Sequence, residues 1–232
     1  MFLKIFAISD LHLSINNPKP MDIFGPAWDD YIEKIIKDWN EKVSDEDIVL
    51  LCGDLSWAMR LEDAKVDINL IGKLKGKKIL LRGNHDYWWS TISKVRGILP
   101  QNMYAIQNDS MIIDNYIFCG TRGWIVDNSK MTLNDKKILD RELIRLEMSL
   151  KQAKEKQTEN QKIVCLMHFP PFDKNNNPTA FTTLIEKYGV DIVVYGHLHG
   201  KIPNIKEVLT LNNINYYLSS CDMVKNKLVR IC

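Results

Sequence analysis

The chain of 232 residues lacks the features that identify several large classes of protein. It has no apolar run of about 18 residues, so we expect no membrane-spanning helix. The short apolar run near the N-terminus contains Lys4 and ends in Asp10 without a small-residue cleavage site, so no secretory signal peptide is predicted. Lys plus Arg number 31 against 29 Asp plus Glu, and this balance gives no electrostatic reason to expect a nucleic-acid or membrane partner.

Cysteine is also scarce. The five cysteines are odd in number, and no two have the C-x-x-C spacing of a redox or metal motif. Cys52, Cys119 and Cys165 lie within or at the end of apolar runs. We interpret them as small buried side chains in a reducing compartment, and we expect a cytoplasmic protein.

What remains is ordinary globular composition, with 45% hydrophobic and 26% charged residues. That composition excludes disordered and fibrous classes. The length favours a single domain over residues 1–232, with a helical insertion at about 130–158. Oligomeric state is left open by the sequence.

Short runs rich in Ile and Val predict buried strands. These runs are Leu3–Ile8, Ile48–Cys52, Ile79–Leu81, Ile113–Cys119, Ile163–Met167 and Ile192–Tyr195. Apolar residues at helical spacing predict amphipathic helices at about 28–43, 61–71 and 132–156, and Thr132 with Asp135 resembles a capping box. Further short strands in the second half favour two mixed sheets with helices outside, an α/β protein (α+β in some schemes).

Five of the predicted strands are followed by polar residues of the same chemical kind. The segments are Ser9-Asp10-Leu11-His12, Gly53-Asp54, Gly83-Asn84-His85-Asp86, His168 and Gly196-His197-Leu198-His199. The chain has only five histidines, and all five lie in these segments. Each segment alone is explained by a turn or a cap. Together they predict one site, because the carboxyl ends of strands converge in layered α/β structures.

The residue types at these strand ends indicate a metal site. Imidazole, carboxylate and amide oxygen suit hard or borderline divalent ions, and no cysteine joins them, which disfavours thiolate zinc or iron–sulfur sites. Six or seven ligands are too many for one tetrahedral zinc ion and fit two ions. Two ions about 3.5–4 Å apart are the usual clamp for displacement at phosphorus.

In this order, the five segments resemble the calcineurin-like metallophosphoesterase superfamily, and the chain resembles its small bacterial-type phosphohydrolases. The resemblance implies a four-layer α/β/β/α sandwich of two mixed sheets flanked by helices, the metallo-dependent phosphatase fold. It implies that one metal is held by Asp10, His12 and His199, the other by Asn84, His168 and His197, with Asp54 bridging both. His85 would face the phosphate as a proton donor or transition-state stabiliser, and Asp86 would orient it.

The resemblance further implies a phosphoric ester hydrolase that cleaves phosphate mono- or diesters, with a hydroxide between two divalent ions as the nucleophile. Manganese is the first choice of metal, and iron, zinc, nickel and cobalt are alternatives. The expected partner is a small phosphoester, and a nucleotide-like ester is one candidate. One departure from the family pattern is Gly53-Asp54-Leu55-Ser56-Trp57, where a later polar position common in the family is absent.

Two other functions remain open at this point. A nuclease would use a basic groove, for which Lys73, Lys75, Lys77 and Lys78 are the one local candidate. A non-catalytic scaffold of the same fold would have a degraded set of ligands, whereas here none is missing.

Aromatic and basic residues near the motifs have two interpretations. Trp57, Trp88, Trp89 and Trp124 either stack on a base or sugar of the substrate or pack in the core, and packing is the more common outcome. Arg82 and Arg122 follow predicted strands, but the sequence assigns neither a role.

Overall fold

The computed structural model describes residues 3–126, 131–200, 202 and 205–232. The strands are β1 (Ile5–Ala7), β2 (Ile48–Leu51), β3 (Lys77–Leu80), β4 (Met103–Ala105), β5 (Ser110–Ile113), β6 (Tyr116–Thr121), β7 (Lys162–Met167), β8 (Ile192–Tyr195), β9 (Val208–Leu211), β10 (Ile214–Leu218) and β11 (Val229–Arg230). The α-helices are α1 (Tyr31–Lys42), α2 (Leu61–Gly72), α3 (Ile92–Arg96), α4 (Leu133–Lys156) and α5 (Ala180–Lys187). Two 3₁₀ turns, η1 (Asp22–Phe24) and η2 (Pro26–Trp28), precede α1.

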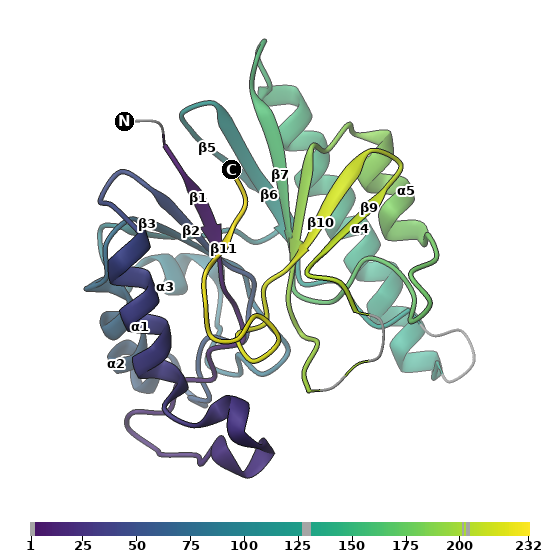
Figure 1. The fold of residues 1–232 in the computed structure, drawn as a ribbon. Helices are drawn as coiled ribbons and strands as arrows, with labels where there is room; N and C mark the ends of the chain where they lie inside the picture. The colour runs from purple at the N-terminus through teal and green to yellow at the C-terminus, as the bar shows by residue number, and fades with distance from the viewer. Residues whose placement is uncertain (1–2, 127–130, 201, 203–204) are drawn as a thin grey trace.

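The strands form two mixed sheets that face each other. One has the order β11-β1-β2-β3-β4, and the other has the order β5-β6-β7-β8-β10-β9. In the first sheet only β11 is antiparallel to its neighbour, and in the second only β5 and β9 are. Helices α1–α3 lie outside the first sheet and α4 and α5 outside the second (Figure 1). This is the expected four-layer α/β/β/α sandwich.

Alternation along the strands divides the apolar side chains between three cores. In β1, Ile5 and Ala7 point into the core between the sheets, where Phe118 and Val164 of the second sheet meet them. Phe6 points the other way, into the core beneath the outer helices. This follows from the two-residue period of a strand. Strands buried on both faces therefore appear as continuous apolar runs in the sequence.

Helix α4 begins as predicted. Thr132 and Asp135 form a capping box, and the stripe through Leu146, Leu150 and Ala153 is buried against the second sheet. Residue 130, the start of the expected insertion, lies outside the described residues. Helices α3 and α5 were not predicted, because both are short and a brief apolar segment has no clear period.

Two further expectations concern the cysteines and membrane-spanning helices. Cys52, Cys119 and Cys165 are fully buried free thiols, as predicted. Across the described ranges, no helix combines the length and the apolar character needed to cross a bilayer.

Candidate metal centre

The structure brings the predicted strand-end residues together at one edge of the sandwich. Asp10 and His12 follow β1, and Asp54 follows β2. The other predicted ligands lie after β3, β7 and β8, and are Asn84, His168, His197 and His199. Strands β1, β2 and β3 run parallel to one another in the first sheet, and β7 and β8 run parallel in the second. Their carboxyl ends meet at the edge drawn lowest in Figure 1.

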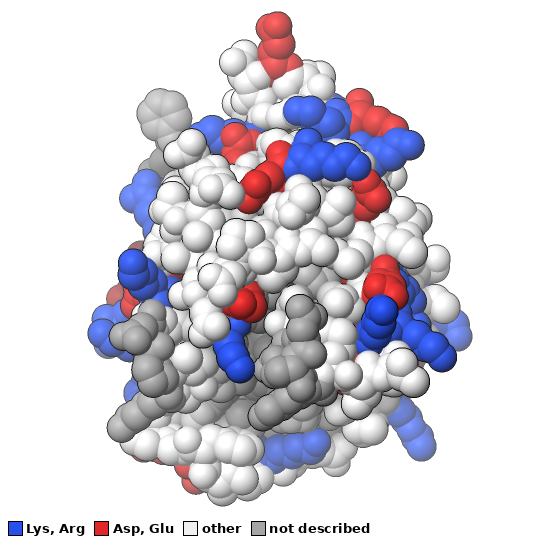
Figure 2. Space-filling view, turned by 90° about the vertical axis from the view of Figure 1, so that its right-hand side faces the viewer, with Lys and Arg blue, Asp and Glu red and all other residues white. Residues whose placement is uncertain are grey.

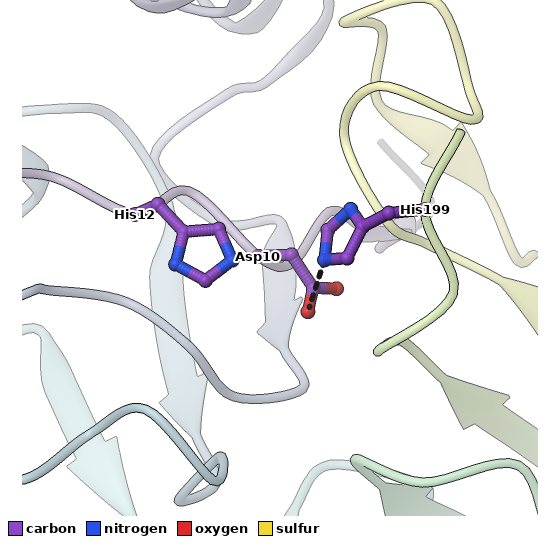
Figure 3. A group of neighbouring side chains, drawn as sticks. All are labelled: Asp10, His12 and His199. Carbon is purple, nitrogen blue, oxygen red and sulfur yellow. Dashed lines mark ion pairs between the residues drawn. The ribbon is translucent and has the colours of Figure 1, made fainter. Parts of the chain in front are cut away.

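The first group of potential ligands consists of Asp10, His12 and His199. One ligand atom of each lies within 4.8 Å of the others, and His199 Nε2 is 3.6 Å from Asp10 Oδ1. Figure 3 shows the two rings and the carboxylate facing a common space from the loops after β1 and β8. These are the three residues expected to hold the first metal.

The second group consists of Asp10, Asp54 and His168. His168 Nε2 is 3.5 Å from Asp54 Oδ2 and 2.6 Å from Asn84 Oδ1. The ring of His197 lies beside that of His168, with centroids 5.1 Å apart. Asp54 Oδ2 also lies 3.8 Å from His12 Nε2, so this oxygen stands between the two groups, as a bridging ligand would.

Several buried polar atoms at the site have no hydrogen-bond partner. Asp54 Oδ2 and His12 Nδ1 are buried and have no hydrogen-bond partner. His168 Nδ1 lies 2.9 Å from the carbonyl oxygen of Cys52, to which it donates, so Nε2 presents a lone pair toward Asn84 Oδ1. Buried acceptors facing one another are costly unless a cation lies among them. The donor set thus fits divalent metal ions.

The pKa values of the carboxyl and imidazole groups are shifted far from their usual ranges. Burial, with the nearby carboxylates Asp86 and Asp10, raises the pKa of Asp54 to about 9. Burial alone would raise the pKa of Asp10, but His199 and His168 overcome it and hold that pKa well below its usual range. Burial lowers the pKa of His12 to about 3. A bound cation would favour the ionised form of Asp54 and the neutral form of His12, the forms that ligate metals.

The backbone is strained where the ligands lie. Asp10, His12, Asp54 and His197 all have positive φ, between 45° and 71°. Left-handed residues with side chains cost energy and persist where surrounding structure holds them in place. Gly83 leaves the space that Asp54 needs, because a Cβ at position 83 would collide with the Asp54 carboxylate.

Asp86 does not orient His85, contrary to the expectation from the resemblance. Its two carboxylate oxygens accept the backbone N–H groups of Asp54, Leu55, Ser56 and Gly83 and the indole N–H of Trp88. His85 Nδ1 is buried without a hydrogen-bond partner. Asp86 therefore joins the loop after β2 to the loop after β3, which positions Asp54 and Asn84. Sequence adjacency misled because consecutive side chains point in different directions.

Asp222 is a site residue that the sequence reasoning missed. Its Oδ1 lies 2.8 Å from His199 Nδ1, and its Oδ2 accepts the N–H of Gly200 at 2.9 Å. A carboxylate on the far nitrogen of a ligating imidazole fixes the tautomer and raises basicity. Burial opposes protonation of His199, but Asp10 and Asp222 raise its pKa to about 10. The available signal was position, since Asp222 also follows a strand, β10.

A cavity of about 630 Å³ opens onto the centre. Its lining combines the polar rings of His12, His85 and His199 with apolar side chains, which are Met21, Phe24, Pro26, Trp28 and Trp57. Trp57 stacks on the ring of His12 at 4.7 Å, at the place where the usual polar residue is absent. Trp88 and Trp89 are buried, as the packing interpretation predicts, and Trp124 lies in a different cavity.

The lysine cluster weighed as a nucleic-acid contact lies elsewhere. Lys73, Lys75 and Lys77 precede or begin β3, whereas Asn84 follows it, so they are at the opposite end of the strand. Lys78 is fully buried, and its ammonium donates to the carbonyl of Leu74. Figure 2 shows basic and acidic side chains intermixed on the right-hand side of the molecule of Figure 1.

Comparison with known proteins identifies the family. The model of the calcineurin-like phosphoesterase family matches residues 3–201, and the chain belongs to this family. An uncharacterized protein of Methanocaldococcus jannaschii, MJ1445, is 36% identical over 84 residues, 36% of this chain and 47% of that protein. The match thus spans about half the length of this curated relative.

Solved structures share the fold at low identity. A protein of unknown function from Aquifex aeolicus, AQ665, has a TM-score of 0.54 and 15% identity, covering 99% of this chain and 96% of its own. TT1561 of Thermus thermophilus has a TM-score of 0.58 and 14% identity, covering 99% and 98%. GAP50, described as the anchor in the inner membrane complex of Plasmodium, has a TM-score of 0.53 and 15% identity, covering 95% and 72%. Such likeness shows the fold alone.

Proposed function

We propose that the protein is a metal-dependent phosphoesterase that hydrolyses small phosphate mono- or diesters with two divalent ions, manganese being the first choice. The observation that carries the proposal is the position of Asp54, whose unpartnered Oδ2 lies between His12 and His168. Asp10, His12 and His199 would hold one ion, and Asn84, His168 and His197 the other. Bound ions at such a centre neutralise phosphoryl oxygens and activate water.

His85 is the proposed proton donor to the leaving group. It lines the cavity, is assigned to neither ion, and has a ring centroid 5.7 Å from that of His12. Because its Nδ1 has no carboxylate partner, the protein holds this ring by packing, with the Trp57 ring centred 4.7 Å away. The backbone N–H of His85 donates to Asp54 Oδ1 at 2.7 Å, which ties the donor to the proposed bridging ligand.

The shape of the cavity supports a substrate with an apolar or aromatic group beside the phosphate. Trp28 and Trp57 line the cavity and lie against the rings of His199 and His12, with centroids 5.6 and 4.7 Å apart. Phe24 also lines it, with two thirds of its surface exposed. Apolar walls with a few convergent polar groups are typical of small-ligand sites. No comparable observation favours a nuclease.

The test is hydrolysis of nitrophenyl phosphate and bis(nitrophenyl) phosphate by the manganese-loaded protein. We expect turnover of at least one ester, and a 10²- to 10⁴-fold lower kcat for His85→Ala with its metal content retained. His168→Ala should lose both metal and activity, which separates ligand from proton donor. A wild-type protein that binds two ions yet is inert toward both esters with manganese, iron, zinc and nickel would overturn the proposal in favour of a scaffold.

A further inference from the structure

A second cavity, of about 390 Å³, contains four arginines that the proposed reaction does not use. Arg82 follows β3, Arg122 follows β6, and Arg141 and Arg145 lie one turn apart on α4. The single carboxylate in the lining is Glu142, so the cavity has an excess of three positive charges. Guanidinium groups from three separate parts of the fold thus line one cavity.

The Glu142 carboxylate offsets only one of the four arginine charges. Glu142 is buried and is already engaged by Thr121 Oγ1 at 2.6 Å and by Arg145 at 2.7 Å, with Arg122 at 3.7 Å. Within the described ranges, Arg82 and Arg141 have no hydrogen bond or ion pair from their side chains. Burial, opposed by Glu142 and assisted by the other three guanidinium groups, lowers the pKa of Arg122.

Two guanidinium groups that line the cavity each keep one donor without a partner in the protein. The Nε atoms of both Arg82 and Arg122 are buried and have no hydrogen-bond partner. Trp124 lies beneath the Arg122 guanidinium at 4.8 Å, which fixes the plane of that group. Guanidinium groups held in fixed planes bind phosphoryl oxygens through paired N–H donors.

We propose that Arg82, Arg122, Arg141 and Arg145 form a binding site for a phosphoryl anion, distinct from the metal centre. Three excess charges match a dianionic phosphoryl group better than a single carboxylate. The site borders the metal centre, because Arg82 is two residues before Asn84 and the backbone carbonyl of Arg122 accepts the N–H of His168 at 3.1 Å. The phosphoryl group is either a free anion or a second phosphoryl group of the substrate.

The test is calorimetric titration of inorganic phosphate into the manganese-loaded protein. We expect Arg82→Gln/Arg141→Gln to bind one phosphate fewer per chain than the wild type, or to bind it at least tenfold more weakly. These two arginines are chosen because their replacement breaks no described contact, and the Arg141→Gln single variant should give an intermediate loss. Lys151→Gln, which removes one exposed charge from the same helix outside the cavity, is the control and should match the wild type.

The difference in bound phosphate between the double variant and the wild type does not depend on whether the protein catalyses the proposed reaction. If the metal centre binds no phosphate, the wild type still binds one and the double variant none. Equal phosphate binding by the wild type and the correctly folded double variant would overturn the proposal. Steady-state kinetics of the double variant then distinguish a free anion from a second phosphoryl group of the substrate. If the variant has a higher KM than the wild type only for a bisphosphate substrate, the arginines form a substrate subsite. If its KM values are unchanged, they bind a free anion.

Discussion

Asp54 is predicted to reduce the stability of the metal-free protein, and replacing it with asparagine should raise that stability. The carboxyl is 1% exposed, and its pKa is about 9 because of burial and the neighbouring Asp86 and Asp10. At pH 7.5 it therefore takes up a proton on folding. Asparagine is neutral and of the same shape, and its Oδ1 can still accept the N–H of His85.

The magnitude follows from proton linkage. Each pKa unit corresponds to about 1.36 kcal/mol, so protonation of a carboxyl of ordinary pKa 3.8 at pH 7.5 costs up to about 5 kcal/mol. Relaxation and water entry lower this ceiling, and we expect Asp54→Asn to gain about 2–4 kcal/mol, or roughly 5–15 °C in Tm. Because the folded pKa is raised, the cost is absent below pH 3.8 and grows toward pH 9. The advantage of the variant must therefore shrink as the pH falls to 5.

The assay is thermal unfolding by circular dichroism in excess chelator at pH 5, 6.5 and 8. The exposed Asp140 on α4 provides the control, and Asp140→Asn should leave Tm unchanged. Manganese should then stabilise the wild type more than Asp54→Asn, because the variant lacks the carboxylate between the two groups. The reasoning would be refuted if Asp54→Asn were less stable than the wild type without metal, or if the difference in Tm between them did not change with pH.

Three further predictions concern the surroundings of the centre. Asp222→Ala should weaken metal binding about 10–100-fold in equilibrium dialysis, because His199 loses its orienting carboxylate, and an unchanged affinity would count against this role. Metal affinity should rise from pH 6.5 to 9, since Asp54 and His199, with pKa values of about 9 and 10, must release protons; a flat calorimetric profile would contradict it. Asp86→Ala should lower the free energy of unfolding by about 3–5 kcal/mol in urea, because five buried N–H groups lose their acceptor; normal stability with lost activity would instead make Asp86 catalytic.

Local pattern in the sequence was sufficient to predict the layers. Strands buried on both faces appear as Ile- and Val-rich runs such as Ile48–Cys52, and the capping box at Thr132 with its apolar stripe predicted α4. Helices α3 and α5 were not predicted, because a helix of eight residues or fewer has about two turns, too few to show helical periodicity in the sequence. The bounds of strands such as β11 depend on pairing partners distant in sequence.

The sequence by itself also determined which residue types gather at the strand ends, because each motif directly follows its strand. Only the tertiary structure decided what their neighbours are. Side-chain directions depend on φ, ψ and rotamer rather than on spacing in the sequence. For this reason the sequence did not show that Trp57 stacks on His12, that Asp222 bonds His199, or that Asp86 joins two loops. The four arginines show the same limit most clearly. They are scattered over residues 82–145, and the packing of α4 against the second sheet is what turns them toward one cavity.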